Sequence, residues 1–157
     1  MNSLEDEVLV SLRRIIRATD IYSRRLGKET GLTTPQLVII RAIAGAGEPT
    51  VSKIAAHVSL SLATVTTILN RLESSGLVQR ERSSVDRRRI NVSLTDKGRA
   101  LGASAPDPLQ DRFAKRFRAL ASWEQHQLVA SLERIANMMD AEDLDAAPLL
   151  ATGEEFK

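Results

Sequence analysis

The stretch at residues 50–95 decides the fold of this chain, and it reads TVSKIAAHVSLSLATVTTILNRLESSGLVQRERSSVDRRRINVSLT. Apolar residues recur at helical spacing over residues 51–58 and again over residues 62–72, with a short turn at residues 59–61 between them. Gly76 can take the left-handed backbone conformation that ends a helix, so the second helix is expected to stop there. The pattern predicts two consecutive helices joined by a tight turn.

Two strand patterns follow the helix pair. Residues 77–82 are the first candidate strand, and in the second the apolar residues Ile90, Val92 and Leu94 alternate with polar ones, as in a half-buried strand. The loop between them, SSVDRRR at residues 83–89, is longer than a tight turn and should project as a wing. Together these elements predict a mainly α fold with a small β-hairpin wing, a winged helix-turn-helix, whose second helix enters the DNA major groove.

The second helix has a short, polar outer face. Asn70 and Arg71 carry the fork-shaped groups that read adenine and guanine, and short neighbours let a helix lie close to base edges. The residues expected at the groove or at flanking phosphates are Ser61, Ala63, Thr64, Thr66, Thr67, Asn70 and Arg71. For this helix alone an ordinary solvated face is the better explanation, so the prediction depends on the wing.

The wing loop carries three consecutive arginines. Three adjacent positive charges would not stabilise a loop, but they can bind a phosphate backbone or a narrow minor groove. The candidate DNA contacts in the hairpin are Arg82, Asp86, Arg87, Arg88 and Arg89. Asp86 is expected to pair with Arg88 and so to stiffen the loop. A merely solubilising loop is the weaker explanation.

The motifs of this stretch resemble those of the MarR family of bacterial transcriptional regulators. They are the run at residues 62–80, the wing motif Asp86-x-Arg88, Leu94-Thr95-x-x-Gly98 and, upstream, Leu32-Thr33-x-x-Gln36. The resemblance covers about the central half of the chain. It implies a sequence-specific regulator that binds double-stranded DNA, in the form of a homodimeric repressor of a pseudo-palindromic operator. The alternatives are an architectural DNA-binding protein without a ligand response, or an enzyme whose active site follows no known motif.

The resemblance also assigns roles along a single domain. Residues 33–95 would bind DNA, residues 1–30 and 96–140 would form a helical dimerisation region, and residues 141–157 would be a tail. The segment DAEDLDAAPLL, at residues 140–150, is similar to the tail of regulators of compatible-solute genes such as those for ectoine.

A small-molecule effector would bind in the crevice between the dimer helices and the winged module, as the resemblance implies. The residues expected near it are Tyr22, Arg25, Leu37 and Arg41. Simple packing is the alternative explanation for these four residues, and the sequence does not decide between the two.

The charges of the chain are unevenly distributed. Residues 50–99 hold nine Lys or Arg against four Asp or Glu, whereas residues 100–157 hold six against ten. Positive charge therefore gathers on the predicted DNA-binding module, and the acidic C-terminal part should face away from DNA. Aromatic residues make up only 3% of the chain, which argues against a single-strand or RNA binder that stacks bases on rings.

Several other classes of function are not supported by the residues. The two histidines, His57 and His126, have no partner at i+3 or i+4 for a metal pair, and neither a nucleophile elbow nor a Walker-type loop is present. The chain lacks cysteine, so disulfides and thiol redox sensing are excluded. We therefore expect no enzyme, no metal and no cofactor, and a cytoplasmic protein that has no signal peptide and does not enter a membrane.

Outside the module the sequence predicts further helices. They are expected over residues 4–27 and 33–45, from a Thr95 cap through Ala103, and from a capping box at Ser122 and Gln125 to Met139. Pro106 and Pro108 are expected to kink or break the helix after the wing, a departure from the unbroken helix usual in the family.

Overall fold

The computed structural model describes residues 3–84, 86, 88–107 and 109–142. Arg87 and residues 143–157 lie outside this part, so most of the predicted tail and its resemblance to compatible-solute regulators cannot be compared with the structure.

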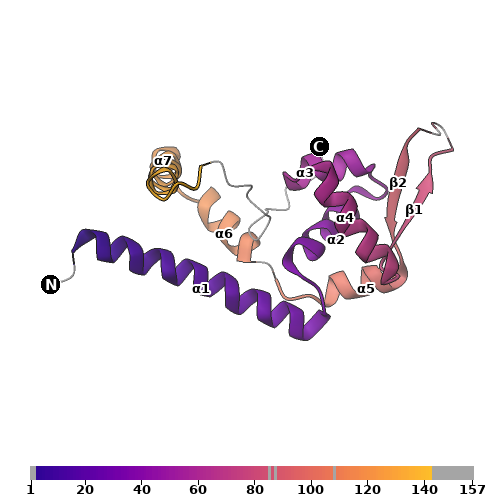
Figure 1. The fold of residues 1–157 in the computed structure, drawn as a ribbon, viewed down its shortest axis with the longest axis horizontal. Coiled ribbons are helices and arrows are strands. Elements are labelled where there is room, and N and C mark those ends of the chain that lie inside the picture. Colours follow the sequence, from indigo (N-terminus) through magenta and orange to yellow (C-terminus); the bar gives the residue numbers. More distant parts are fainter. Residues whose placement is uncertain (1–2, 85, 87, 108, 143–157) are drawn as a thin grey trace.

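Within the described residues the chain forms seven helices and one antiparallel hairpin, in the arrangement drawn in Figure 1. In chain order the elements are α1 (Leu4–Thr30), α2 (Thr34–Ala46), α3 (Val51–Val58), α4 (Leu62–Ser74), β1 (Val78–Arg82), β2 (Ile90–Leu94), α5 (Asp96–Ser104), α6 (Leu109–Arg118) and α7 (Ser122–Met138). The predicted fold class, mainly α with a small β-hairpin wing, is confirmed.

Helices α3 and α4 form the predicted helix-turn-helix. They are bent by 112° relative to each other, within the range of this motif. Ser59 turns the chain with a positive φ of 54°, and the neighbouring Leu60 is buried beneath the turn. Each helix has a side-chain N-cap, since the hydroxyl of Thr50 accepts from the Lys53 N–H and that of Ser61 accepts from the Thr64 N–H.

The hairpin follows α4 at once. Gly76 adopts a φ of 69°, as predicted, and reverses the chain so that β1 runs back along α4. Strands β1 and β2 pair from Val78 opposite Leu94 to Arg82 opposite Ile90. The Val92 N–H also donates to the carbonyl oxygen of Pro49 at 2.9 Å, which ties the base of the wing to the start of α3.

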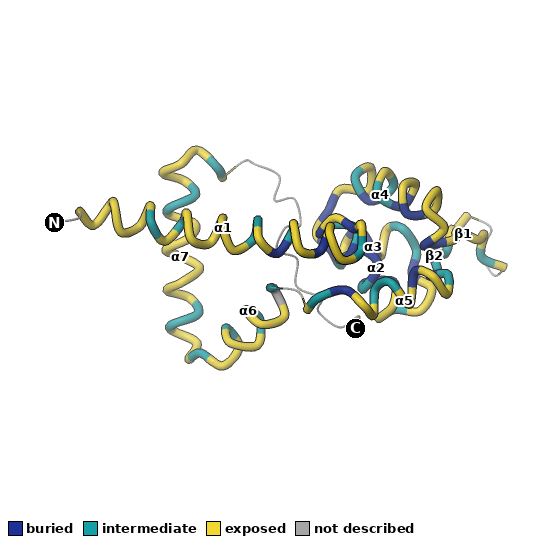
Figure 2. The backbone as a smooth tube through the Cα atoms, turned by 90° about the horizontal axis from the view of Figure 1, so that it is seen from below, coloured by how far each residue is buried: buried dark blue, intermediate teal, exposed yellow. Residues whose placement is uncertain are grey.

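A single aliphatic core holds these elements together. Its fully buried side chains come from the end of α1 and from α2, α3, α4 and β2, as the dark blue segments of Figure 2 illustrate, and include Leu26, Ile39, Ile40, Ile43, Ile54, Val65, Leu69, Leu72 and Val92. Each such side chain contributes about 1.5–3 kcal/mol of hydrophobic free energy relative to an exposed one. The core therefore fixes where α4 and the wing lie relative to each other.

Helix α5 packs against this core at close range. Thr95 caps it with its hydroxyl on the Gly98 N–H, and the same hydroxyl donates to the carbonyl oxygen of Gly76 at 2.7 Å. A Cβ built on Gly98 would lie 2.0 Å from the Leu77 carbonyl oxygen, so only glycine fits there. The chain then leaves α5 in extended conformation at Ala105, and α6 starts at Leu109. The structure thus has a break near the prolines, not a kink.

The terminal helices are mostly exposed, as the yellow tubes of α1, α6 and α7 show in Figure 2. Helix α7 buries none of its side chains, and α1 buries only Tyr22 and Leu26. Large apolar side chains lie open on these helices, among them Leu4, Ile15, Ile16, Ile21, Phe113, Trp123, Leu128, Val129, Leu132 and Met138.

Several predicted helix boundaries were wrong. Helix α1 continues through Gly27 to Thr30, because Gly31, with a φ of 71°, is the residue that takes the left-handed conformation. Helix α2 likewise runs on to Ala46 before Gly47.

The N-terminal cap of α7 is also shifted from the prediction. The Glu124 carboxylate accepts from the Ala121 N–H, whereas the Gln125 amide donates to the Leu120 carbonyl oxygen. The predicted pairing of Ser122 with Gln125 is therefore not formed.

Two apolar residues of the predicted core faces are instead exposed. Leu62 is 53% exposed at the first turn of α4, and Ile90 is 43% exposed where β2 leaves the core toward the wing loop. Helical or strand periodicity assigns a face, but the core does not extend to the ends of these elements.

Candidate nucleic-acid interface

The outer face of α4 is short-chained, polar and open. Ala63, Thr67, Asn70 and Arg71 are exposed, and Thr64 and Thr66 are half-buried. The threonine hydroxyls are held locally, because Thr66 donates to the Leu62 carbonyl oxygen at 2.7 Å and Thr67 donates to that of Ala63 at 3.0 Å. Their methyl groups and lone pairs remain for contacts outside the helix.

The N-terminus of α4 is capped by Ser61. The Ser61 hydroxyl caps the Thr64 N–H at 3.1 Å and lies 2.7 Å from the Thr64 hydroxyl. First-turn N–H groups and the helix dipole favour negative charge at this end, which suits a phosphate of a DNA strand.

The wing loop is braced around Asp86. One oxygen of its carboxylate accepts from the backbone N–H of Arg88 at 3.0 Å, and the other lies 3.6 Å from Nε of Arg89. The Asp86 carbonyl oxygen accepts from the Arg89 N–H, and Ser83 N–H donates to the Arg89 carbonyl oxygen, both at 2.9 Å. The carboxylate therefore holds the backbone of Arg88 and the guanidinium of Arg89, rather than the guanidinium of Arg88 as the sequence suggested.

The arginines of the wing lie exposed at its edge. Arg82, Arg88 and Arg89 are exposed, on a hairpin that projects beyond the helical body in Figure 1. Arg87 is outside the described residues. Wing and helix thus present cationic and polar side chains on neighbouring elements.

One side-chain cluster joins α4 to the wing, and the sequence did not predict it. Arg80 of β1 donates from Nε and Nη2 to one Glu73 oxygen, at 3.1 and 2.7 Å, and Nη2 also donates to Oδ1 of Asn70. The available signal was the spacing, since Asn70 and Glu73 share a helix face and Arg80 follows the Gly76 reversal by four residues.

Of the four residues predicted at a ligand crevice, Tyr22 and Arg41 face the start of α6. The Tyr22 hydroxyl donates to the Pro106 carbonyl oxygen at 3.4 Å, and Arg41 forms an ion pair with Asp111 at 3.2 Å. Burial raises the pKa of Tyr22, Arg41 acts in the opposite direction, and the carboxylates of Asp111 and Asp107 raise it further. The phenol therefore stays neutral at physiological pH.

The other two residues of that set lie differently. Leu37 is a fully buried core residue, and Arg25 pairs with Glu29 on α1 itself at 2.8 Å.

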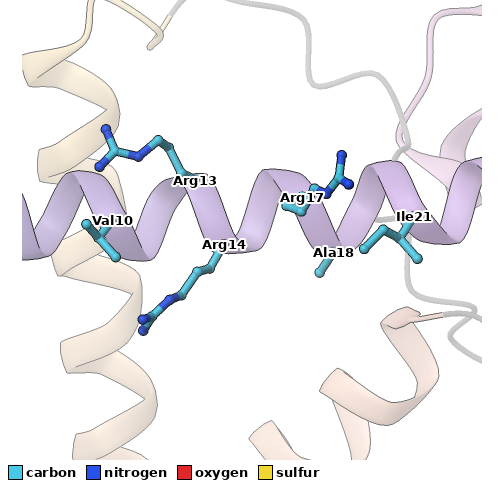
Figure 3. Close-up of a pocket in the computed structure, with 6 residues that line it drawn as sticks. All are labelled: Val10, Arg13, Arg14, Arg17, Ala18 and Ile21. Carbon is cyan, nitrogen blue, oxygen red and sulfur yellow. The ribbon is translucent and has the colours of Figure 1, made fainter.

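A shallow groove of about 560 Å³ runs along α1 and is lined by Val10, Arg13, Arg14, Arg17, Ala18 and Ile21. Figure 3 shows that its three guanidinium groups point in different directions. They do not converge on one point, so the groove is not a formed anion site.

Among the residues that the structure describes, no group of three or more His, Cys, Asp or Glu could hold a metal ion. No single described helix is long and apolar enough to cross a membrane. Helices α3 and α4 satisfy that criterion only when taken together as a bent pair.

These elements define a winged helix-turn-helix protein, and comparison with known proteins gives its family. The MarR family model matches residues 32–90. The chain is 39% identical over 104 residues to the transcriptional regulator HosA of Escherichia coli O157:H7, covering 66% of this chain and 76% of HosA. It is 31% identical over 101 residues to the HTH-type transcriptional regulator MgrA of Staphylococcus aureus, covering 64% of this chain and 69% of MgrA.

A solved structure supports the same assignment. The crystal structure of a MarR mutant from E. coli complexed with operator DNA matches with a TM-score of 0.52 and 25% identity, over 85% of this chain and 99% of that one. The chain therefore belongs to the MarR family of transcriptional regulators, as the resemblance in its motifs predicted.

Proposed function

We propose that this chain is a sequence-specific double-stranded DNA-binding regulator, a homodimeric repressor of a pseudo-palindromic operator. The observation that carries the proposal is the exposed polar face of α4 beside the wing. In the wing loop the Asp86 carboxylate accepts from the backbone N–H of Arg88 and so stiffens the loop. A helix in the major groove and an arginine wing beside it would read base edges and backbone together. The proposed contacts are Ser61, Ala63, Thr64, Thr66, Thr67, Asn70, Arg71, Arg82, Asp86, Arg87, Arg88 and Arg89.

The open apolar faces of α1 and α7 support the dimer. Trp123 and Met138 are each 68% exposed, and Leu4 is 82% exposed, whereas most of the apolar residues described in the winged body are buried. Large exposed apolar surfaces mark association sites. A second copy of this chain would cover it and would place two recognition helices on one DNA duplex.

A footprinting experiment on duplexes selected from a random library tests the function. The protein should protect a discrete site with two-fold symmetry, with half-site centres about 34–36 Å apart along the duplex. Continuous coating of the duplex without a boundary would favour an architectural protein and contradict the proposal. We propose that such a regulator acts in the cytoplasm.

Replacing Arg88 with alanine should weaken operator binding and flatten its salt dependence. Its backbone N–H is held by Asp86 while its side chain is exposed, so the guanidinium is presented to DNA on a stiffened loop. Loss of one phosphate-like contact lowers the log–log salt slope by up to about one unit. If Arg88 enters a narrow minor groove, the variant also becomes less sensitive to A·T content beside the half-sites. A salt titration of operator binding measures both effects.

The matched control is Arg24→Ala, which removes the same charge from α1, where Arg24 pairs with Asp20 at 3.1 Å. It should leave affinity and slope unchanged. A folded Arg88→Ala protein with wild-type affinity and slope would show that Arg88 is only a solvated charge.

We further propose that a small anionic effector binds beside Tyr22 and Arg41, near Leu37 and Arg25. Arg41 is already paired with Asp111 of α6, so an anion that competes for this guanidinium would release α6 from the winged body. Thermal-shift measurements with small carboxylates check this. A stabilisation that persists in Arg41→Met would place the ligand elsewhere.

A further inference from the structure

The cluster of Arg80, Glu73 and Asn70 sets the chemistry that Asn70 can offer to DNA. Arg80 lies between α4 and β1 with its side chain only 21% exposed, and it donates to both partners. The buried neighbours Leu77 and Val78 fix β1 against the core at this point. The guanidinium is therefore held in place by packing as well as by its hydrogen bonds.

A guanidinium has only N–H donors, so the Asn70 atom that faces it must be the carbonyl oxygen. The orientation of the Asn70 amide, which is ambiguous for an isolated asparagine, is thereby decided by its partner. Its oxygen is turned toward Arg80 and uses one of its two lone pairs there, and its NH₂ group is the end left to face outward from the exposed surface of α4.

This orientation of the amide is unfavourable for the bidentate contact that asparagine usually makes with adenine. Bidentate recognition of adenine needs the amide NH₂ on N7 and the amide oxygen on the N6 amino group. An amide that presents only its NH₂ group can still donate to adenine N7, but it loses the second bond and meets the adenine amino group with a like donor. Guanine offers O6 and N7, and thymine offers O4, as acceptors in the major groove.

Resting on the DNA-binding function proposed above, we propose that Asn70 is a donor-only specificity residue that selects a base with a major-groove keto group, guanine or thymine, over adenine or cytosine. Arg80 is the positioning residue that holds the amide in this orientation, and Glu73 holds Arg80 through two hydrogen bonds to one carboxylate oxygen. The identity of one base per half-site is therefore decided partly by a residue of the wing strand.

The test is selection from a random duplex library, followed by affinity measurements on all four bases at each position of the enriched site. For the wild type, one position per half-site should favour keto over amino bases by about tenfold, a difference that one or two hydrogen bonds supply. Asn70→Asp keeps the contact with Arg80 but removes the NH₂ donor, so the preference at that position should invert toward adenine or cytosine.

Arg80→Met removes the donors at similar side-chain length, so the Asn70 amide should turn freely and the same preference should fall to below about threefold. Arg80→Lys keeps one charged donor and should restore part of it. The matched control is Arg82→Met on the same strand, which should lower affinity for all sequences alike, as a lost phosphate contact does. Circular dichroism reports folding, and Asn70→Asp tests the proposal even if the Arg80 variants fail to fold.

The outcomes separate the two proposals. If selection with the wild-type protein enriches no duplex, the proposed DNA-binding function is wrong, and the inference about Asn70 is wrong as well. If the wild type enriches an operator but its Asn70-sensitive position favours adenine, or no position responds to Asn70→Asp, this inference alone is overturned. An unchanged base profile in folded Arg80→Met would likewise exclude the positioning role.

Discussion

Replacing Gly98 with alanine should lower the free energy of unfolding by about 3 kcal/mol or more, the upper end of the overpacking range. The added Cβ would lie 2.0 Å from the Leu77 carbonyl oxygen, and backbone cannot move aside as a side-chain end can. That carbonyl oxygen also accepts from the Thr95 N–H at 3.1 Å, so relieving the clash would pull apart the junction of the wing with α5. Such a loss is a large part of the about 5–15 kcal/mol that stabilises most domains.

Two other glycines provide a graded control. A Cβ on Gly102 would lie 2.7 Å from Cγ2 of the buried Ile40, a longer approach than that at Gly98 and to a side chain instead of backbone, so Gly102→Ala should destabilise less. A Cβ on Gly27 would meet nothing within 4 Å, and Gly27 lies inside α1, so Gly27→Ala should raise stability by about 0.5–1 kcal/mol. Urea unfolding at one fixed protein concentration measures all three. A Gly98→Ala protein as stable as the wild type would contradict the close approach.

Replacing Leu132 with arginine should convert the proposed dimer to a monomer and weaken operator binding by about 10²–10⁴-fold. Leu132 is 51% exposed on α7, so the change costs the isolated subunit little, but it would bury a charge where a second copy packs. With the subunits apart, each recognition helix binds its half-site alone and the gain from linking two sites is lost. Light scattering and operator titration measure the two effects on one sample.

The matched control is Ala44→Arg, which adds the same charge to an exposed residue of α2, outside the helices α1 and α7 whose apolar side chains support the dimer. It should leave both the mass and the affinity unchanged. A wild type that scatters as a monomer with and without DNA would overturn the dimer itself, and a dimeric Leu132→Arg would place the interface elsewhere.

The helices of the DNA-binding module could be predicted from the sequence because their signals are local. Apolar spacing over residues 51–58 and 62–72 gave both helices of the motif, and Gly76 marked the reversal before β1. The prolines after α5 predicted the interruption, since a proline lacks the N–H that a helix needs. The exposed residues on α4 followed from the same periodicity.

Where the predicted helix boundaries were wrong, the observed boundary depends on the backbone conformation of a single residue, which the residue type alone does not reveal. Gly27 and Gly31 are both candidate stops, and only the backbone conformation of Gly31 ends α1. Leu62 and Ile90 fit their periodic faces, yet each is exposed because the core stops short of the end of its element.

The sequence by itself determined the class of fold and the order of helices and wing, because periodicity, caps and turns depend on residues a few positions apart. The residues that it indicates as DNA contacts remain a prediction. Only the tertiary structure decided which of those residues are already engaged. Asp86 holds the backbone of Arg88 and the side chain of Arg89, and Asn70 meets Arg80 across the reversal at Gly76. Gly98 is required by a backbone oxygen twenty-one residues earlier in the chain, that of Leu77. The contacts of Asp86 are local and depend on the conformation of the wing loop. Those of Asn70 with Arg80 and of Gly98 with Leu77 form between segments that meet only when the core brings α4, the hairpin and α5 together, so spacing along the chain permits them but does not decide them.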